Sequence, residues 1–217
     1  MLEAVLFDFD GVLVDTPTYY FTHIKAYMEK INANVSDEDI SNLLGLTFTK
    51  KLEFINAKYS LKIEREPFVS LVSNPMMAEM EKSLILDEHL DVLLKDLKMH
   101  NITMAIASNN SLSNIEFFLS RLKISHYFSK IISYADVKEH KPAPDTYLKA
   151  INLLGTNPQN CVAIEDTVVG VESAKAAGLK CVAIPNKFAS SHNFSRADLV
   201  IKTFLGLDVK KLEALVK

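Results

Sequence analysis

Short apolar runs bounded by polar residues recur along the chain and predict buried strands. The first run covers residues 4–10. Five more lie near residues 102–107, 130–133, 161–165, 181–185 and 198–201. Short, nearly continuous apolar runs are typical of strands covered on both faces, as in a parallel sheet. From residue 87 onward they alternate with helical patterns, and this alternation predicts an α/β fold with a doubly wound, Rossmann-like parallel sheet.

Residues 16–85 have a different pattern, with helical spacing and no convincing strand. Apolar residues recur every three or four positions over Tyr19–Ile31, which predicts a helix. Ser36 precedes three acids and is typical of a helix start, and Leu52–Tyr59 predicts a further helix. The stretch 68–86 predicts one or two helices, because Pro75 disfavours helical geometry at the residue before it.

The helical stretch therefore lies between the first and second predicted strands. We expect an α/β core of residues 1–15 and 86–217 and an inserted helical domain of residues 16–85. An insert at this place can close over the strand ends, exclude water and carry side chains that select a substrate. The alternative is that these helices only enlarge the core or form an oligomer contact.

Composition narrows the class of protein. The chain has 217 residues, 48% of them hydrophobic, which is enough to bury a substantial core. Its formal net charge of −3 gives no general attraction to nucleic acid or to an anionic membrane. Cys161 and Cys181 both lie in apolar strand patterns, so buried free thiols are favoured over a disulfide.

The chain shows no membrane or export signal. No stretch approaches the roughly 20 apolar residues of a membrane-spanning helix. No basic region precedes the first apolar run, and Asp8 interrupts that run early, so we expect no signal peptide. We therefore expect a cytoplasmic protein without membrane or nucleic-acid partners, and a monomer by default.

The first candidate for chemistry is the pair of acids at the end of the first run. Alternation along a strand would point Asp8 and Asp10 the same way, toward the edge of the sheet where ligands bind in open α/β folds. Two crowded carboxylates repel each other, so they favour a bound cation or a shared proton. Gly11 lets the chain turn close to that site. Alone, this pair could equally be a solvated acidic turn.

Three further polar segments follow apolar runs or precede a helical pattern. Ser108 and Asn109 follow the second run and can donate hydrogen bonds to phosphate oxygens. Lys141 begins a proline-containing turn that restricts its position. Glu165 and Asp166 end the run at 161–165. Each could separately be a helix cap, a surface lysine or an acidic strand edge, but together and in this order they predict one site.

These four segments resemble the motifs of the haloacid dehalogenase superfamily of phosphohydrolases. The sequence that starts at Lys141 (Lys-Pro-Ala-Pro-Asp) and the one that starts at Glu165 (Glu-Asp-Thr-Val-Val-Gly-Val) are similar to those of the β-phosphoglucomutase and sugar-phosphatase branch. The resemblance covers nearly the whole chain. It implies that the insert is a small helical cap domain and that the substrate is a small phosphorylated metabolite.

The resemblance also implies a role for each residue. Asp8 would be the nucleophile and Asp10 the general acid and base, while Ser108 and Lys141 would hold the phosphoryl oxygens. Asn109 would add a donor, and Thr16 would lie at the hinge of the cap. Mg²⁺ would be bound by the carboxylates of Asp8 and Asp166, the backbone carbonyl of Asp10, and Glu165 directly or through a water.

The expected function is a Mg²⁺-dependent phosphatase, with two alternatives. A β-phosphoglucomutase needs a second anion site in the cap, where the family carries an arginine; the matching residue here is Phe48, and Tyr20 stands where mutases have a histidine. Lys50, Lys51 or Arg65 could compensate in part. A non-catalytic phosphate-sensing module is the other alternative, although the helical insert and the full motif set argue against it.

Overall fold

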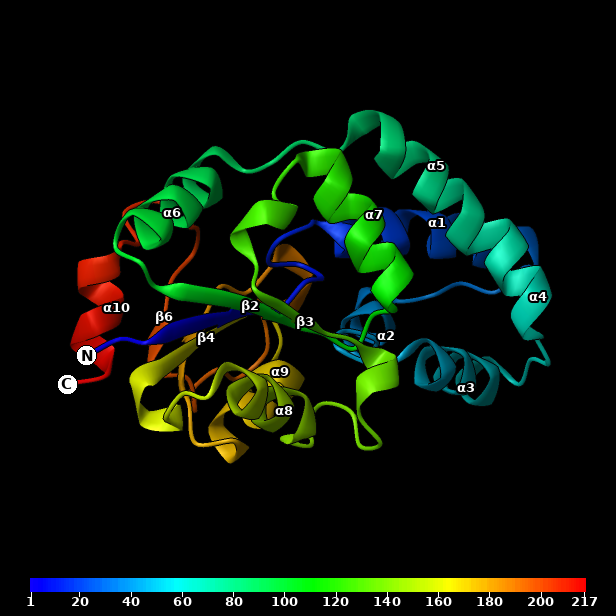
Figure 1. The fold of residues 1–217 in the computed structure, drawn as a ribbon. Helices are drawn as coiled ribbons and strands as arrows, with labels where there is room; N and C mark the ends of the chain where they lie inside the picture. Colours follow the sequence, from blue (N-terminus) through cyan, green and yellow to red (C-terminus); the bar gives the residue numbers. More distant parts are fainter.

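The computed structural model describes residues 1–217 and contains a six-stranded parallel sheet (Figure 1). The strand order is β3-β2-β1-β4-β5-β6, so the order reverses between β1 and β4. The strands are β1 (Ala4–Phe7), β2 (Thr103–Ala107), β3 (Lys130–Ile132), β4 (Cys161–Glu165), β5 (Lys180–Ala183) and β6 (Leu199–Val200). The expected doubly wound α/β sheet is confirmed. Such a reversal creates a crevice at the carboxyl ends of the central strands.

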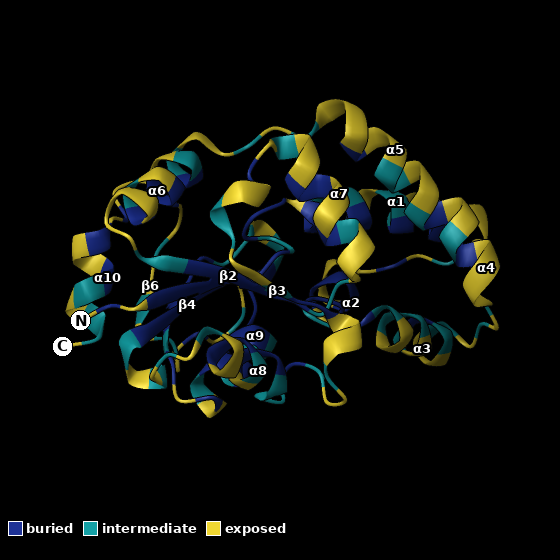
Figure 2. Cartoon of the chain, in the orientation of Figure 1, coloured by how far each residue is buried: buried dark blue, intermediate teal, exposed yellow.

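Helices cover both faces of this sheet because successive strand residues point to opposite sides. Ala4 and Leu6 of β1 pack in one apolar cluster with α8 (Asp145–Leu154) and α9 (Val168–Ala176). Val5 and Phe7 pack in the other cluster. That second cluster includes α6 (Glu88–Met99), α7 (Leu112–Leu122) and α10 (Val209–Leu215). The four central strands β1, β2, β4 and β5 are therefore deeply buried, whereas the edge strands β3 and β6 are partly exposed (Figure 2).

Five helices lie between β1 and α6 in the chain and form a separate layer beyond the strand ends (Figure 1). They are α1 (Thr16–Lys30), α2 (Asp37–Ser41), α3 (Phe48–Tyr59), α4 (Arg65–Phe68) and α5 (Asn74–Ser83). Their caps follow from the sequence: Asp15 accepts from the Thr18 amide, Ser36 from the Asp39 amide and Thr47 from the Lys50 amide. No strand occurs among them, as expected, although the division into core and cap remains a prediction.

One expected element boundary was wrong, and the choice between one and two helices over residues 68–86 is now decided. The first strand ends at Phe7, so Asp8 and Asp10 lie in the turn that follows it and strand alternation does not orient them. Pro75 does not break the helix at Asn74. A π-helical turn over Val69–Ser73 joins α4 to α5, and the Asn74 amide donates to the Val69 carbonyl. The wider π turn accommodates a proline without ending the helix.

The remaining short elements are single 3₁₀ turns. They cover Ser125–Tyr127, Tyr134–Asp136, Pro158–Asn160 and Lys187–Ala189. Cys161 and Cys181 are buried and free, as expected. None of the helices has both the length and the apolar character that crossing a membrane requires.

Candidate active site

Three carboxylates meet where the strand order reverses. Asp8 follows β1, Glu165 is the last residue of β4 and Asp166 comes directly after it. One oxygen of each lies within 4.8 Å of the others, and all three residues are buried. Parallel neighbours β1 and β4 pair Phe7 with Ile164, which brings the residues after both strands to the same edge of the sheet. The register of two central strands therefore builds this cluster.

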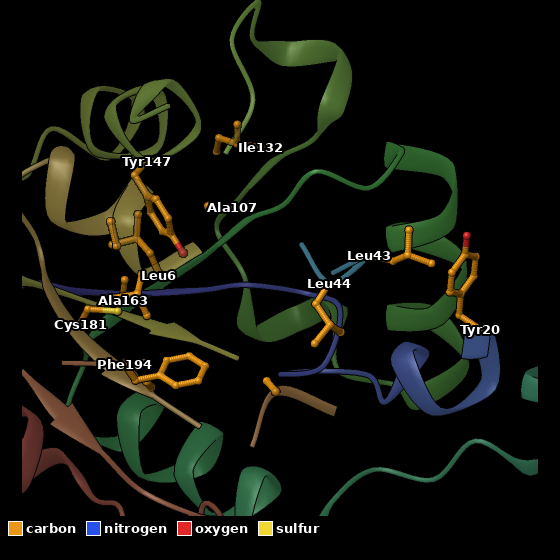
Figure 3. Packing of buried hydrophobic residues seen from close by; sticks show 14 of the residues in the cluster. Leu6, Tyr20, Leu43, Leu44, Ala107, Ile132, Tyr147, Ala163, Cys181 and Phe194 are labelled. Carbon is orange, nitrogen blue, oxygen red and sulfur yellow. The ribbon is translucent and has the colours of Figure 1, made fainter. Parts of the chain in front are cut away.

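Lys141 joins two of the three carboxylates. Its Nζ lies 2.7 Å from Oδ1 of Asp8 and 2.6 Å from Oε1 of Glu165, and its side chain is almost fully buried. The hydroxyl of Tyr147 on α8 also donates to Oε1 of Glu165, at 2.6 Å. Figure 3 shows the Tyr147 ring in the apolar cluster that it shares with Leu6 of β1. The polar end of an otherwise apolar core residue thus reaches the site.

The cluster holds more negative charge than Lys141 can balance. Burial raises the pKa of Asp8 to about 7, despite the opposing effect of Lys141. Burial, followed by the charges of Asp8 and Glu165, raises the pKa of Asp166 well above its ordinary value. Burial lowers the pKa of Lys141, but the two neighbouring carboxylates outweigh it and the pKa rises. Further positive charge at this place would stabilise the ionised acids.

The carboxylate oxygens of the cluster that lack a hydrogen-bond partner suit a hard cation. Oδ1 of Asp166 and Oε2 of Glu165 are buried and have no hydrogen-bond partner. Mg²⁺ prefers oxygen ligands from one or two carboxylates and retains water. The residues present therefore fit a divalent cation held by Asp8 and Asp166, with Glu165 beside them.

Two glycines leave the space that these carboxylates occupy. A Cβ on Gly11 would meet Oδ2 of Asp166, and a Cβ on Gly170 would meet Oε2 of Glu165, each at 1.9 Å. Gly11 also has a positive φ of 84°, which disfavours other residues. At Gly170 the missing side chain leaves room for the Glu165 carboxylate.

Asp10 belongs to a second polar group beside the cluster. It accepts a 2.5 Å hydrogen bond from the Thr16 hydroxyl at the start of α1. The side-chain amide of Asn110 donates to both of its carboxylate oxygens, at 3.1 Å each. These donors fix the orientation of the acid. The sequence placed Thr16 near the site but did not indicate the contact between Asn110 and Asp10.

Ser108 and Asn109 follow β2 and reach the same edge. Ser108 is buried, and its hydroxyl oxygen accepts from the Asn110 amide. Asn109 donates to the Gly45 carbonyl and accepts from the backbone amide of Lys141. In this arrangement Asn109 links the core to the loop before α3. Its expected role as a phosphate donor stays a prediction.

All the expected site residues line one cavity of about 430 Å³. The α1–α5 layer contributes its other wall, including Tyr20, Phe48, Lys51 and Arg65. The guanidinium of Arg65 lies over the Phe48 ring, with Cζ 4.7 Å from the centroid. The apolar ring at Phe48 therefore supports a cation, which sequence reasoning did not foresee.

Comparisons with known proteins agree with this geometry. The model of the haloacid dehalogenase-like hydrolase family matches residues 5–184. A bifunctional riboflavin kinase/FMN phosphatase of Arabidopsis thaliana is 32% identical over 96% of this chain, which spans only 55% of that protein. A fructose-1-phosphate phosphatase of Escherichia coli (strain K12) is 30% identical, over 82% of this chain and 94% of that protein.

A solved structure gives the same answer for the fold. The β-phosphoglucomutase of Clostridium difficile superposes with a TM-score of 0.84 at 25% sequence identity. The match covers 100% of this chain and 97% of that one. This chain is therefore an enzyme of the haloacid dehalogenase-like hydrolase family, in the branch that holds β-phosphoglucomutases and sugar phosphatases.

Proposed function

We propose that this protein is a Mg²⁺-dependent phosphatase that hydrolyses small phosphomonoesters, sugar phosphates among them, through an aspartyl-phosphate on Asp8. One observation carries the proposal: Asp8, Lys141 and Asp166 converge at the carboxyl edge of the sheet, beside a cavity of about 430 Å³. The phosphatases among the similar proteins support the reaction class.

In the first step a carboxylate oxygen of Asp8 attacks the phosphorus of the substrate. The bond between phosphorus and the ester oxygen breaks, and Asp10 gives its proton to that oxygen. Thr16 and Asn110 hold Asp10 in place. Ser108 and Lys141 bind the phosphoryl oxygens, and Lys141 reduces the repulsion between the anionic substrate and Asp8.

In the second step water attacks the phosphorus of the aspartyl-phosphate. Asp10, now a carboxylate, takes a proton from that water. The bond between phosphorus and Asp8 breaks, which releases inorganic phosphate and restores the Asp8 carboxylate. The same acid thus serves both half-reactions in opposite protonation states.

Mg²⁺ would be held by Asp8, Asp166 and the backbone carbonyl of Asp10, with Glu165 binding directly or through water. When bound, it supplies positive charge to the phosphoryl oxygens during transfer. Two observations support this part of the proposal. Three buried carboxylates lie close together, and one oxygen each of Asp166 and Glu165 has no hydrogen-bond partner.

The proposal includes a lid function for residues 16–85 above a core of residues 1–15 and 86–217. Two contacts between these parts support it. Asn109 donates to the Gly45 carbonyl, and the Ser41 hydroxyl donates to the Phe188 carbonyl. Asp8 is only 8% exposed beneath this layer, so a substrate reaches it when the lid opens and loses water when the lid closes.

We further propose that the enzyme acts as a monomer in the cytoplasm on small phosphorylated metabolites. Buried free thiols at Cys161 and Cys181 are consistent with a reducing compartment. The net charge of −3 gives no basis for binding nucleic acid.

The mutase is the second candidate, because the fold matches a β-phosphoglucomutase. A mutase returns the phosphoryl group to its sugar, whereas a phosphatase passes it to water. A coupled assay that follows both glucose 6-phosphate and inorganic phosphate from β-glucose 1-phosphate separates the two. We expect phosphate release without a bisphosphate activator. Faster formation of glucose 6-phosphate would overturn the phosphatase assignment.

The experiment on mechanism uses p-nitrophenyl phosphate and a panel of sugar phosphates, nucleotides and phosphoglycolate. We expect turnover with Mg²⁺, loss of turnover with EDTA and no turnover by Asp8→Asn. Asp91→Asn, at a surface acid that pairs with Lys95, is the matched control and should keep wild-type activity. Circular dichroism checks the fold of each variant. More than trace activity in a clean preparation of Asp8→Asn would refute the aspartyl-phosphate.

A further inference from the structure

One aromatic ring of the α/β core lies at the cavity without being part of the apolar core. Tyr134 begins the 3₁₀ turn Tyr134–Asp136 after β3, lines the cavity and is 42% exposed. It belongs to neither of the two apolar clusters that flank the sheet. Aromatic rings bury more area than most side chains, yet the core gains little from this one. Packing of the core therefore does not explain why this ring lies at the cavity.

Hydrogen bonds fix the turn that carries Tyr134. The amide and the hydroxyl of Ser133 both donate to Oδ2 of Asp136, at 2.8 and 2.7 Å, and close the turn. The backbone amide of Tyr134 donates to the Asn110 carbonyl at 2.8 Å. The ring therefore extends from a backbone that is held on both sides.

His140 covers one face of the Tyr134 ring. The two rings are stacked, with centroids 4.0 Å apart and planes at 19°. Nδ1 of His140 is buried and has no hydrogen-bond partner, so no hydrogen bond at that nitrogen holds the ring in place. Burial, followed by the charge of Lys50, lowers the pKa of His140, so the imidazole is neutral at pH 7. The surface of Tyr134 that His140 leaves free is therefore the part that lines the cavity.

Tyr134 lies next to the place where the leaving group would depart. Asn110, whose carbonyl accepts from the Tyr134 amide, donates its side-chain amide to both carboxylate oxygens of Asp10. Asp10 is the acid that would protonate the leaving oxygen. Because Tyr134 belongs to the core, its backbone stays in register with Asp10 whatever position the α1–α5 layer takes.

We propose that Tyr134 is a stacking platform for the leaving group, so that the preferred substrates are phosphomonoesters that carry a planar aromatic or heteroaromatic ring. A flat ring on the free side of Tyr134 continues the stack that His140 begins. Such a contact is worth roughly two- to tenfold in affinity. Met76 and Met77 of α5 line the same cavity, and methionine sulfur contacts aromatic rings favourably. This inference rests on the proposed phosphatase function and specifies its substrate class.

The deciding test compares benzyl phosphate with cyclohexylmethyl phosphate. Both are esters of a primary alcohol that carries a six-membered ring, so the leaving groups have similar acidity and differ in whether the ring is flat. The saturated ring is the more apolar one, so burial alone would favour it. We expect kcat/KM to be at least about threefold higher for benzyl phosphate. Tyr134→Leu should abolish this preference, mainly by raising KM for benzyl phosphate, whereas Tyr134→Phe should keep it.

Adenosine 5′-monophosphate and ribose 5-phosphate form a second pair, in which the flat ring lies further from the phosphorus. A preference for the compound with the flat ring that Tyr134→Leu abolishes, in either pair, supports the platform and shows where the ring binds.

Phe117 provides the matched control. It is an aromatic residue of α7 that is 40% exposed and does not line the cavity. Phe117→Leu should leave the preference in both pairs unchanged. Turnover of all four compounds with ratios that Tyr134→Leu does not alter would overturn the platform while leaving the phosphatase intact.

Binding measurements keep the test independent of turnover. Calorimetry on Asp8→Asn protein should show tighter binding of benzyl phosphate than of cyclohexylmethyl phosphate, or of adenosine 5′-monophosphate than of ribose 5-phosphate. Addition of Tyr134→Leu should remove that difference. Equal binding within both pairs would overturn the platform. Absence of phosphate release from every compound by the wild type would instead count against the proposed function.

Discussion

The Tyr147 hydroxyl donates to the same oxygen of Glu165 that Lys141 holds, at 2.6 Å in both cases. Tyr147 is fully buried among apolar residues, so this hydroxyl has no access to water. One carboxylate oxygen of Glu165 is thereby fixed by two donors, while the other has no partner. Tyr147 does not line the cavity, yet its hydroxyl helps to orient Glu165 within the cluster.

We therefore predict that Tyr147→Phe weakens Mg²⁺ binding. Loss of a residue that orients a ligand typically costs about 10-fold or more in metal affinity. Titration with Mg²⁺ in the absence of substrate, followed by calorimetry, measures the change directly. Tyr127→Phe, away from the cluster, should bind Mg²⁺ as the wild type does. Unchanged affinity in Tyr147→Phe would show that the hydroxyl only satisfies a buried carboxylate.

The metal-free protein should become less stable as the pH rises from about 5 to about 7. The pKa of Asp8 rises from 3.8 to about 7 on folding, mainly through burial, so the folded state binds more protons than the unfolded state between these values. The free energy of unfolding then falls with increasing pH across that window. Denaturant unfolding in EDTA at several pH values measures this slope, and Asp8→Asn should flatten it. Equal slopes in both proteins would contradict the prediction.

Gly170→Ala should destabilise the protein, although α9 would gain a better helix former. Helix propensity alone favours alanine over glycine by about 1 kcal/mol. The new methyl group, however, would meet Oε2 of Glu165 at 1.9 Å and displace the carboxylate. Thermal unfolding should show a lower Tm and Mg²⁺ titration a weaker affinity. In a double-mutant cycle, Glu165→Ala should relieve the destabilisation, and simple additivity would contradict the clash.

The α1–α5 layer should move when a ligand binds. Asp8 is 8% exposed beneath it, and we expect the layer to open for substrate entry and to close over the bound substrate. We expect Mg²⁺ with vanadate to shift small-angle scattering toward a more compact profile. Ser41→Ala removes a hydrogen bond from α2 to the Phe188 carbonyl and should favour the open form before ligand is added. Identical profiles in all states would argue against a lid.

The parallel sheet was predictable from the sequence because its strands are short apolar runs bounded by polar residues. It also predicted that Asp8, Ser108, Lys141 and Asp166 lie together, since their side chains follow strands or a rigid turn. Whether each has its expected role remains to be measured. The orientation of the two acids after β1 could not be predicted, because the strand ends at Phe7 and a turn directs them.

Residues that depend on distant partners were not predictable from local pattern. Tyr147 looks like one more apolar residue of α8, and only packing against β4 places its hydroxyl at Glu165. Arg65 and Phe48 are separated by a whole helix in the chain, so no spacing rule connects them. The π turn before Pro75 and helix α5 both pack on α1, and the sequence around the proline does not show that contact.

The absence of a side chain at Gly11 and Gly170 has a consequence for which substitutions this enzyme tolerates. Neither glycine has a side chain, and a carboxylate of the cluster fills the space beside each. Even a methyl group at either position would therefore displace Asp166 or Glu165. A mutational scan would therefore mark both as intolerant, although neither has a reactive group. Protein engineers who vary the cavity for new substrates should leave these two unchanged and vary the walls instead.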